Sequence, residues 1–431
     1  MQRWLISMGA VVAMAQAGAA LAAPAYIHAG RLMAVPGQPV RGPSTIIVDA
    51  GRIVAVRDGY VPGAAGSAVI DLKDKIVLPG LIDSHVHLAT DRGGEARLVA
   101  FMREEPQMNA LEAQSNGMKT LRAGFTTVRN LGDDGATLAL REAIKRGWVQ
   151  GPRIVDAASS ISTTGGHMDG RGGLNDDLVA HLPSPENLCD GVDQCRKVVR
   201  RQIDRGADVI KFATTGGVNS GTGLATRMNE DEARALVDTA HAYGRKVAVH
   251  AHGADGIKLA LRAGADSIEH GTVMDDEIIR LMKAKGTYYV PTLSTVNGYL
   301  ERLAADPNAY APDVKKQIDW RIGITGQSLA KAYPAGVKIA FGTDAGVSKH
   351  GRNADEFELM VKYGMPPIEA IKAATVNAAD LLGLGKEIGT IETGKSADLI
   401  AVAGDPLADV RVLKSVAFVM VRGDVIAPVA R

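Results

Sequence analysis

The feature that most constrains the fold is a regular alternation of apolar, strand-like runs with Ala- and Leu-rich stretches over residues 78–384. The Ala- and Leu-rich stretches, such as residues 232–242, 255–263 and 276–284, have the spacing of amphipathic helices. Eight runs between them are predicted strands: residues 81–87, 125–130, 153–157, 208–212, 246–250, 265–270, 287–291 and 337–342. This pattern predicts an α/β fold, a (β/α)8 TIM barrel, in which the chemistry lies at the carboxyl ends of the strands.

A doubly wound sheet is the alternative fold for the same alternation. That fold would need a Gly-rich phosphate-binding turn after its first strand. Here the first predicted strand ends instead in two histidines, His85 and His87. The barrel is therefore the favoured prediction.

Both ends of the chain have a different pattern, with short β-type runs separated by Gly and Pro. Near the start these runs cover residues 26–28, 44–48, 52–56 and 68–72, and near the end they cover residues 388–391, 397–403 and 416–422. Because the two pieces flank the barrel, we expect them to pair. The predicted domains are a small β-sandwich built from residues 23–78 plus 386–431, and a barrel of residues 79–385.

Residues 1–22 have the order of a secretory signal peptide: a basic start at Arg3, an apolar stretch, and small residues that end in Ala20-Leu21-Ala22. A membrane anchor is the alternative, but this run is too short and too rich in Ala and Gly for a stable span. We expect cleavage after Ala22 and export, either to the periplasm or out of the cell. No other long apolar stretch follows, so we expect no membrane attachment after cleavage.

Charge and cysteine content further narrow the possible classes of protein. The chain has 49 Lys and Arg against 48 Asp and Glu, which excludes a general electrostatic binder of nucleic acid. Its two cysteines, Cys189 and Cys195, lie close together, and export would place them in an oxidising compartment. A lone C-x5-C pair is a weak metal signal, so a disulfide is favoured over a metal pair.

Histidines at the ends of predicted strands carry the functional signal. His85 and His87 are two residues apart, so both side chains point to the same side of a strand. Further metal-ligating or titratable residues lie in or after the fourth, fifth, sixth and eighth strands: Lys211, His250, His270 and Asp344. In a barrel, all of these side chains would meet at one rim.

Each of these residues alone has an ordinary explanation. A single strand-end His is usually a hydrogen-bonded core residue, a Lys after an apolar strand extends its amine to solvent, and an Asp before Ala-Gly caps a turn. Together they would bury four imidazoles, a carboxylate and an ammonium, which is costly without a metal ion. Their joint occurrence predicts a metal site.

The motifs at these positions resemble those of the metal-dependent amidohydrolase superfamily. They are the run VLPGLIDSHVH that ends at His87, the run Gly342-Thr343-Asp344, and the tail of residues 389–399, so the resemblance covers essentially the whole mature chain. The sequence resembles in particular the imidazolonepropionase-like branch, which contains binuclear dipeptidases acting on C-terminal Pro, Arg or Lys, and ochratoxin-hydrolysing amidohydrolases. In that branch a lysine of the fourth strand, here matched by Lys211, is carboxylated and bridges two metal ions, usually Zn²⁺.

The resemblance implies a role for each residue. His85, His87 and Asp344 would hold the more buried ion, His250 and His270 would hold the second, and carboxylated Lys211 and a hydroxide would bridge them. Carboxylation turns a cation that two metal ions would repel into a bidentate anion. Such a metal pair activates the bridging water and polarises the scissile carbonyl, while Asp344 would act as general base and then as general acid. Family members often form large homo-oligomers, so the resemblance implies one here.

Three further residues are candidate substrate contacts. His252 points to the same side as His250, so spacing leaves either as the fifth-strand ligand, and the resemblance favours His250. His167, in a loop after the third strand, is either a substrate contact or a mobile-loop histidine. The Gly-rich loop of residues 216–223, which contains Gly217, lacks the Lys-Ser/Thr pair of a phosphate cradle, so we interpret it as a border of the substrate pocket.

The sequence thus predicts an exported amide-bond hydrolase that releases a C-terminal amino acid from a dipeptide or an N-acyl amino acid. Ochratoxin A, an N-acyl phenylalanine, is a candidate substrate by resemblance. The alternative within the class is hydrolysis of a cyclic amide, a lactone or a phosphoester at the same metals, since the fold does not decide between them. The alternatives outside the class are a non-catalytic scaffold, which should lack one or more ligands, and a metal-buffering protein, which would not need Asp344 as a proton carrier.

Overall fold

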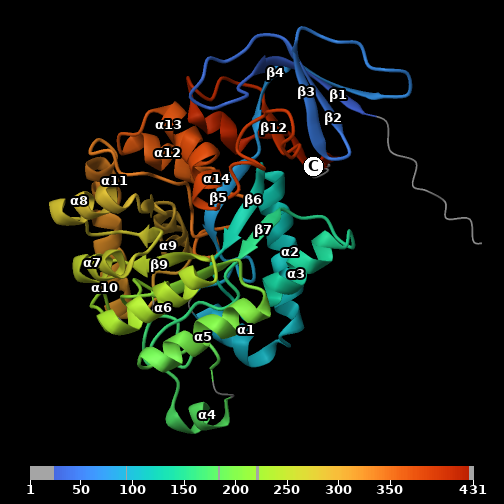
Figure 1. Cartoon of the computed structure of the whole chain (residues 1–431). Coiled ribbons are helices and arrows are strands. Elements are labelled where there is room, and N and C mark those ends of the chain that lie inside the picture. Colours follow the sequence, from blue (N-terminus) through green and yellow to red (C-terminus); the bar gives the residue numbers. More distant parts are fainter. Residues whose placement is uncertain (1–23, 94, 183–184, 220–222, 427–431) are drawn as a thin grey trace, which may run out of the picture.

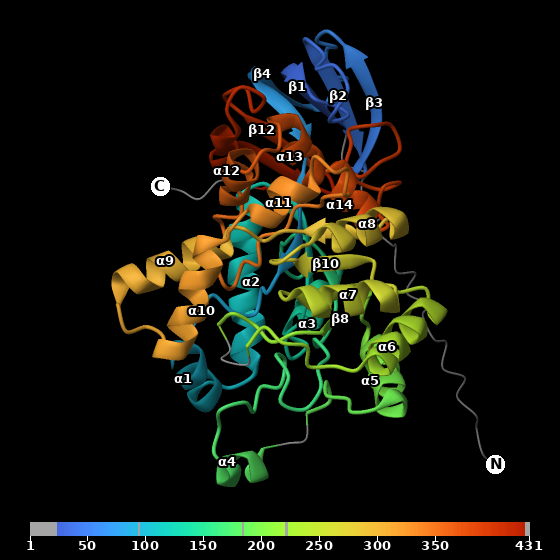
Figure 2. The ribbon, with the colours of Figure 1, turned by 90° about the vertical axis from the view of Figure 1, so that its left-hand side faces the viewer.

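The computed structural model describes residues 24–93, 95–182, 185–219 and 223–426. A barrel forms its centre, a small β domain lies at one end of the barrel, and the short helix α4 (Asp176–His181) lies at the opposite end (Figures 1 and 2). The predicted signal peptide, residues 1–22, lies outside the described residues. Within them, no helix is both long and apolar enough to span a bilayer.

The barrel strands form two parallel sheets. One has the order β5-β6-β7 and the other β11-β10-β9-β8. Their bounds are β5 Leu81–Val86, β6 Phe125–Asn130, β7 Arg153–Asp156, β8 Val209–Ala213, β9 Lys246–Ala251, β10 Ser267–His270 and β11 Tyr288–Val290. These strands are buried almost throughout, as parallel strands covered by helices must be. They match seven of the predicted strands.

The eighth predicted strand, residues 337–342, has the expected place but not a regular ladder. The Tyr289 amide donates to the Lys338 carbonyl at 2.8 Å, and the Ser84 amide donates to the Phe341 carbonyl at 2.8 Å, so this segment joins β11 to β5. On the other side, the Asp208 amide donates to the Asp156 carbonyl at 2.7 Å and links β8 to β7. These bonds close the cylinder and confirm the TIM-barrel prediction.

Helices surround the strands and fill the connections (Figure 1). The predicted helices at residues 232–242, 255–263 and 276–284 correspond to α6, α7 and α8. The helix bounds are α1 Glu95–Arg103, α2 Gln107–Arg122, α3 Ala136–Lys145, α5 Val192–Arg205, α6 Glu230–Ala242, α7 Ala254–Ala263, α8 Asp276–Lys285, α9 Thr295–Ala305, α10 Pro312–Gly323, α11 Gln327–Ala332, α12 Asp355–Lys362, α13 Pro367–Ala373, α14 Val376–Leu381 and the 3-10 helix Val410–Lys414. The apolar faces of α5 to α8 pack on the strands in one large core.

The two ends of the chain share one sheet. Its seven strands have the order β14-β13-β12-β4-β1-β2-β3. Their bounds are β1 Ala25–Leu32, β2 Ser44–Asp49, β3 Arg52–Asp58, β4 Ala68–Pro79, β12 Leu399–Val402, β13 Val416–Val421 and β14 Asp424–Val425. β4 pairs with β1 on one side and with β12 on the other, so the N-terminal and C-terminal pieces meet there. The sheet folds over, since Arg52 of β3 also bridges Ser396 just before β12.

One predicted strand of this domain, residues 388–391, is wrong. The chain turns there because Gly389 has a φ of 91° and lies against α14, where a Cβ atom would come within 2.7 Å of Ala379. Ile391 nevertheless reaches the apolar core of the sheet, and its amide donates to the Ala34 carbonyl at 2.7 Å.

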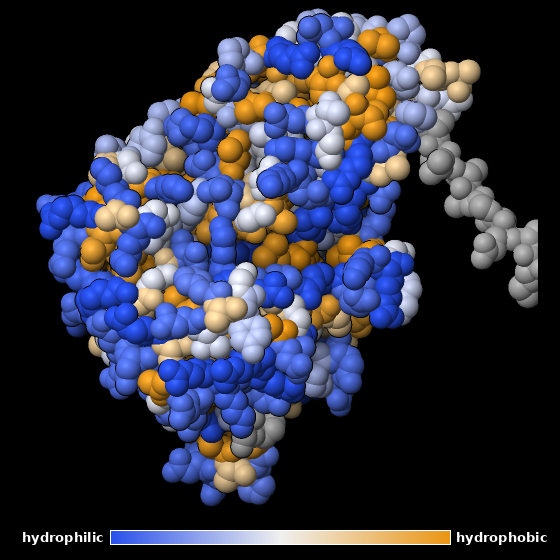
Figure 3. Space-filling model, viewed as in Figure 1, coloured by the Kyte–Doolittle hydropathy of each residue, from blue (hydrophilic) through white to orange (hydrophobic). Residues whose placement is uncertain are grey.

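The connection between β4 and β5 fixes the direction of the barrel. β4 of the small domain continues into β5 through Gly80, where a Cβ atom would lie 2.1 Å from the Thr126 hydroxyl oxygen. The amino end of β5 therefore faces the small domain, and the carboxyl ends of the barrel strands face away from it. On the face shown in Figure 3 the barrel is mainly hydrophilic, while hydrophobic residues gather over the small domain, whose exposed apolar side chains include Val54 and Val69.

Candidate metal centre and active site

The predicted ligands meet at the carboxyl ends of the barrel strands. They form two groups, each with ligand atoms within 4.8 Å of one another: His85, His87 and Asp344 in the first, and His250, His252 and His270 in the second. The rings of His85 and His270 lie 5.0 Å apart, so the two groups are adjacent. The structure thus assembles one site from residues far apart in the sequence.

In the first group, each histidine has one ring nitrogen fixed and the other facing Asp344. Nδ1 of His85 is 2.9 Å from Oε2 of Glu269, and Nδ1 of His87 is 2.9 Å from the Gly132 carbonyl. Their Nε2 atoms lie 3.5 and 3.4 Å from Oδ1 of Asp344. If each Nδ1 donates to its oxygen partner, each Nε2 has a lone pair for a cation shared with Asp344.

In the second group, hydroxyl and carbonyl oxygens orient the rings. Nδ1 of His270 lies 2.8 Å from the Thr292 hydroxyl, which itself donates to the Pro291 carbonyl, so His270 must donate and its Nε2 has the lone pair. Nε2 of His250 lies 3.1 Å from the Gly216 carbonyl, which can only accept, so the lone pair of His250 is on Nδ1. Both His250 and His252 remain in the ligand group, with their rings 4.7 Å apart.

Lys211 lies on β8 near both groups, since its charge acts on Asp344 of the first group and on His250 of the second. Its side chain is buried, and Nζ has no hydrogen-bond partner among the described residues. Burial lowers the pKa of Lys211 to about 8, against the opposing influence of Glu269 and Asp344. Burial is also the main cause that holds the pKa of His85, His250, His252 and His270 well below the ordinary value, and the charge of Lys211 contributes in each case.

The donor set fits divalent cations. Neutral imidazoles with oriented lone pairs and a carboxylate are ligands that zinc and similar ions prefer. Burial raises the pKa of Asp344 to about 7, which reflects how costly this buried carboxylate is without a cation beside it. The buried Lys211 amine, which has no partner among the described residues, also indicates that this site binds a further group, because a buried polar group needs a partner.

The backbone at the rim is strained at ligand positions. His270, Thr292 and Asp344 have φ values of 70°, 48° and 56°, a region that residues other than Gly rarely adopt. Two of these three residues are predicted ligands and the third orients one of them. Such strain at a cluster of functional side chains is typical of an active site.

Several supporting residues are absent from the sequence-based prediction. Arg129 of β6 pairs with Glu269 at 2.8 Å, and Asp83 of β5 accepts from the Thr343 hydroxyl at 2.6 Å, next to Asp344. A signal for both exists, since Arg129 and Asp83 are charged residues within predicted strands. Their partners lie on other strands, so the sequence alone does not reveal what they bind.

The predicted substrate contacts also come together. The ring of His167 stacks on the ring of His250 with centroids 4.2 Å apart. Gly217 lies against His167, and a Cβ atom at position 217 would come within 2.0 Å of that ring. The glycine is therefore required for the close approach of the two loops, and both loops border the second ligand group.

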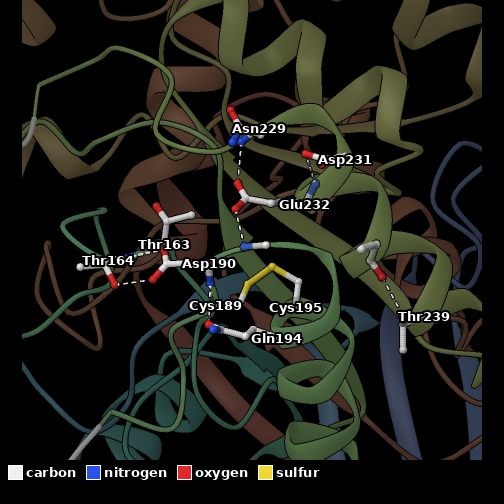
Figure 4. The surroundings of a disulfide bond; sticks show 12 residues. Thr163, Thr164, Cys189, Asp190, Gln194, Cys195, Asn229, Asp231, Glu232 and Thr239 are labelled. Atoms are coloured by element: carbon white, nitrogen blue, oxygen red, sulfur yellow. Dashed lines mark hydrogen bonds between the residues drawn. A yellow bond between two sulfur atoms is a disulfide. The ribbon is translucent and has the colours of Figure 1, made fainter.

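Cys189 and Cys195 form a disulfide (Figure 4). The segment before it is attached to the loop that carries His167: the Cys189 amide donates to the Ser162 carbonyl at 2.9 Å, and the Thr164 hydroxyl donates to Asp190 at 2.6 Å. Glu232, at the start of α6, accepts from the Gly191 amide at 2.7 Å. The disulfide thus lies in the structural support of a predicted substrate loop.

A TIM barrel with a double set of ligands at the carboxyl ends of its strands defines the class of metal-dependent barrel hydrolases. Comparison with known proteins then specifies the family: residues 76–426 match the amidohydrolase family, and the chain belongs to it. This finding confirms the resemblance seen in the motifs. The protein is a hydrolase that acts on amide bonds.

Individual relatives agree with this assignment. Ochratoxinase from Aspergillus niger is 31% identical over 410 residues, which cover 90% of this chain and 83% of ochratoxinase. Among solved structures, a Xaa-Pro dipeptidase with bound methionine in the active site is 41% identical, with a TM-score of 0.88 and coverage of 94% of this chain and 99% of the dipeptidase. A prolidase complexed with N-methylphosphonate-L-proline is 30% identical, with a TM-score of 0.84 and coverage of 94% and 99%.

Proposed function

We propose that the protein is a binuclear metal-dependent amidohydrolase that releases a C-terminal amino acid from a dipeptide or an N-acyl amino acid. The observation that carries the proposal is the buried, partnerless Lys211 amine near both groups of candidate ligands. A single metal ion would need only one of the groups. Two adjacent groups with a buried lysine near both are what a pair of bridged ions would require.

Carboxylation of Lys211 would complete the site. The unprotonated amine would attack CO2 and lose a proton, and the resulting carbamate offers one oxygen to each side. The lowered pKa of Lys211, about 8, increases the share of unprotonated amine at neutral pH. We propose Zn²⁺ at both positions because imidazole nitrogen and carboxylate oxygen predominate among the ligands.

The residues around the site have distinct tasks in the reaction. When bound, the two ions would acidify a water molecule and polarise the scissile carbonyl. Asp344 would take the proton from the attacking water and deliver it to the leaving amine, so that the carboxylate is restored at the end of each cycle. His167 and the loop around Gly217 would hold the substrate on the side of the second ligand group.

The substrate class is supported by the relatives. Their names connect this architecture with Xaa-Pro dipeptides and with ochratoxin, in each of which an amide bond joins an acyl group to an amino acid. We therefore propose dipeptides and N-acyl amino acids as substrates, and ochratoxin A as one to be tested. Cyclic amides, lactones and phosphoesters should be tested beside these substrates, and cleavage of one of them would favour the alternative reactions.

The test combines metal analysis with a substrate screen. Purified protein should contain about two divalent ions per chain, and it should release free amino acids from members of a library of dipeptides and N-acyl amino acids. The Asp344→Asn variant is the control for contaminating hydrolases. Metal-loaded protein that cleaves no member of the library would contradict the proposal, as would a stable content of one ion with full activity.

We also propose export and assembly. Cleavage after Ala22 would produce a mature chain in a compartment where the Cys189–Cys195 disulfide can form. Cell fractionation followed by N-terminal sequencing should find Ala23 as the first residue, and an intact Met1 would contradict export with cleavage.

The proposed homo-oligomer, which is inferred from the family, should elute in size-exclusion chromatography with light scattering at a multiple of the chain mass.

A further inference from the structure

Arg321, in α10, is a buried cation without an acidic partner. Arg321 is only 3% exposed. Nη1 donates to the Thr325 hydroxyl at 3.0 Å, and none of the described carboxylates forms an ion pair with the guanidinium. Within the part of the chain that the structure describes, this arginine thus has no direct ion pair.

Arg129 provides the comparison within the same molecule. It is buried to the same degree, but it pairs with Glu269 at 2.8 Å and donates to the Ser84 carbonyl at 2.6 Å. A buried guanidinium normally has such partners because removal of its hydration shell is costly. The absence of an acidic partner for Arg321 among the described residues therefore indicates an anionic group that arrives from outside the chain.

The helices that carry and flank Arg321 pack on the metal end of the barrel. Helices α9 and α10 follow β11 and lie side by side (Figure 2). Gly298 of α9 lies directly on the loop after Asp344, where a Cβ atom would come within 2.2 Å of the Val347 carbonyl oxygen. The Val347 amide in turn donates to the Asp344 carbonyl at 2.9 Å. Helix α9 is thereby fixed against the loop of the catalytic carboxylate.

The segment after α10 is fixed to the second ligand group. The Ser328 hydroxyl donates to the Thr272 carbonyl at 2.8 Å, and the Thr272 hydroxyl lies 2.7 Å from Nδ1 of His252. Arg321 thus lies on a helix held between the Asp344 loop and the His252 side of the site.

The electrostatic influence of Arg321 agrees with this position. After burial, the guanidinium is the largest cause that lowers the pKa of His252, and it also opposes the effect of burial on Asp344. Its charge is not among the main influences on the pKa of His85 or His270. The guanidinium is therefore near the His252 side of the candidate metal centre.

Tyr299, in α9, adds a second donor at the same place. It is 4% exposed, and its hydroxyl has no hydrogen-bond partner among the described residues. Both Arg321 and Asp344 influence its pKa, which burial raises, so the phenol stays protonated and can donate. A cation without an ion pair and a hydroxyl donor without an acceptor among the described residues thus lie near the same part of the site.

We propose that Arg321 binds the carboxylate of the substrate's C-terminal amino acid, with the Tyr299 hydroxyl as a second donor. The proposal rests on the proposed function, and it adds the residue that selects substrates with a free carboxylate beside the scissile amide. Guanidinium and carboxylate form a charge-assisted, bidentate pair that fixes orientation as well as affinity. The pair would hold the leaving amine toward Asp344, and neutral amides, lactones and cyclic amides would lack this contact.

The test compares an N-acyl amino acid with its C-terminal carboxamide, using the best acyl group and amino acid found in the library screen. Release of the free amine reports cleavage of the same bond in both. We expect the wild-type enzyme to prefer the acid by about 100-fold in kcat/KM. In Arg321→Gln this preference should nearly disappear, because KM for the acid rises while cleavage of the carboxamide changes little.

Two further variants sharpen the result. Arg321→Lys retains the charge and should recover part of the preference for the acid. Arg280→Gln, which removes an exposed arginine from α8, should behave as the wild type. Metal content and circular dichroism of each variant should match the wild type, since Arg321 is not a metal ligand.

The outcomes separate the two proposals. If the wild type cleaves acid and carboxamide equally well, or if Arg321→Gln reduces both equally, Arg321 does not bind the carboxylate although amide hydrolysis stands. If the metal-loaded wild type cleaves neither, the proposed function and this inference both fall. If Arg321→Gln does not fold, inhibition of the wild type by product amino acids against their carboxamides decides: equal inhibition would overturn the inference.

Discussion

The His85 ring is fixed by Glu269, whose Oε2 lies 2.9 Å from Nδ1 of the histidine, and both side chains are at most 1% exposed. The other carboxylate oxygen of Glu269 pairs with Arg129 at 2.8 Å and accepts from the Ser267 hydroxyl. This chain of contacts sets which nitrogen of His85 faces Asp344. The first ligand group is therefore ordered by Glu269 and Arg129, which lie outside that group.

Replacement of Glu269 by Gln should weaken metal binding in the first ligand group. The amide cannot hold the His85 N–H and Arg129 together, and it leaves a buried guanidinium without its counter-charge. We expect the affinity for the more buried ion to fall about 10- to 100-fold, measured by competition with a chromophoric chelator. Glu277→Gln, at an exposed position of α8, is the control, and an unchanged affinity in Glu269→Gln would show that His85 needs no such support.

Replacement of Lys211 by Ala should reduce the metal content below two ions per chain. The central ligand disappears, whereas both histidine groups remain. In the wild type, ¹³C-labelled bicarbonate should produce a carbamate signal in NMR spectra that is absent from Lys211→Ala. Since the pKa of Lys211 is about 8, reconstitution of metal-free protein with CO2 and metal should be faster at pH 8 than at pH 6.5. A wild-type spectrum without the signal would contradict carboxylation.

The sequence was sufficient to predict that the candidate ligands gather at one rim, because their positions follow from local pattern. Each of His85, His250 and His270 lies at the end of an apolar strand, and the topology of a barrel brings all strand ends to one rim. The small domain was predictable for a similar reason, since short β-type runs at both ends need partners.

The supporting residues could not be predicted in this way. Glu269 and Arg129 are 140 positions apart, and their pairing depends on the packing of β6 and β10 inside the closed barrel. Arg321 lies on a helix whose sequence resembles any amphipathic helix, and only its burial without an acidic partner distinguishes it. The turn at Gly389 was missed because a short apolar run has the same pattern in a strand and in a buried turn.

Replacement of Asp344 by Asn should abolish turnover without emptying the site. The amide still offers an oxygen to the first ligand group, but it cannot accept and deliver a proton. We expect near-complete loss of kcat with about two ions retained, measured by steady-state kinetics and metal analysis on the same sample. Substantial remaining activity would assign proton transfer to another group and would favour a metal-buffering role for Asp344.

Asp156 should make the fold less stable as pH rises. Burial raises the pKa of Asp156 to about 7 in the folded chain, next to Asp133, and one carboxyl oxygen has no partner among the described residues. Between the unfolded value near 4 and about 7, the unfolded chain ionises while the folded chain holds its proton, so the free energy of unfolding falls over this window.

The Asp156→Asn variant should therefore gain stability relative to the wild type as pH rises from about 4 to 7 and show a constant difference above that range. Urea unfolding at several pH values measures the difference. Asp424→Asn, at an exposed position of β14, should show no such trend. A difference that does not depend on pH would mean that Asp156 is ionised in the folded chain.

The disulfide should matter for both stability and substrate binding. Replacement of Cys189 and Cys195 by Ala removes the closure of a short loop, which should cost about 2 kcal/mol in urea unfolding. Asn187, just before the bridge, donates to the Met168 carbonyl at 2.9 Å, next to His167, and so connects the bridged segment to the substrate loop. We expect KM to rise in the double variant while metal content stays at the wild-type level.

The single variant Cys195→Ala should behave like the double variant, since either breaks the same bond. A lower stability with an unchanged KM would show that the loop carrying His167 is held by its hydrogen bonds alone.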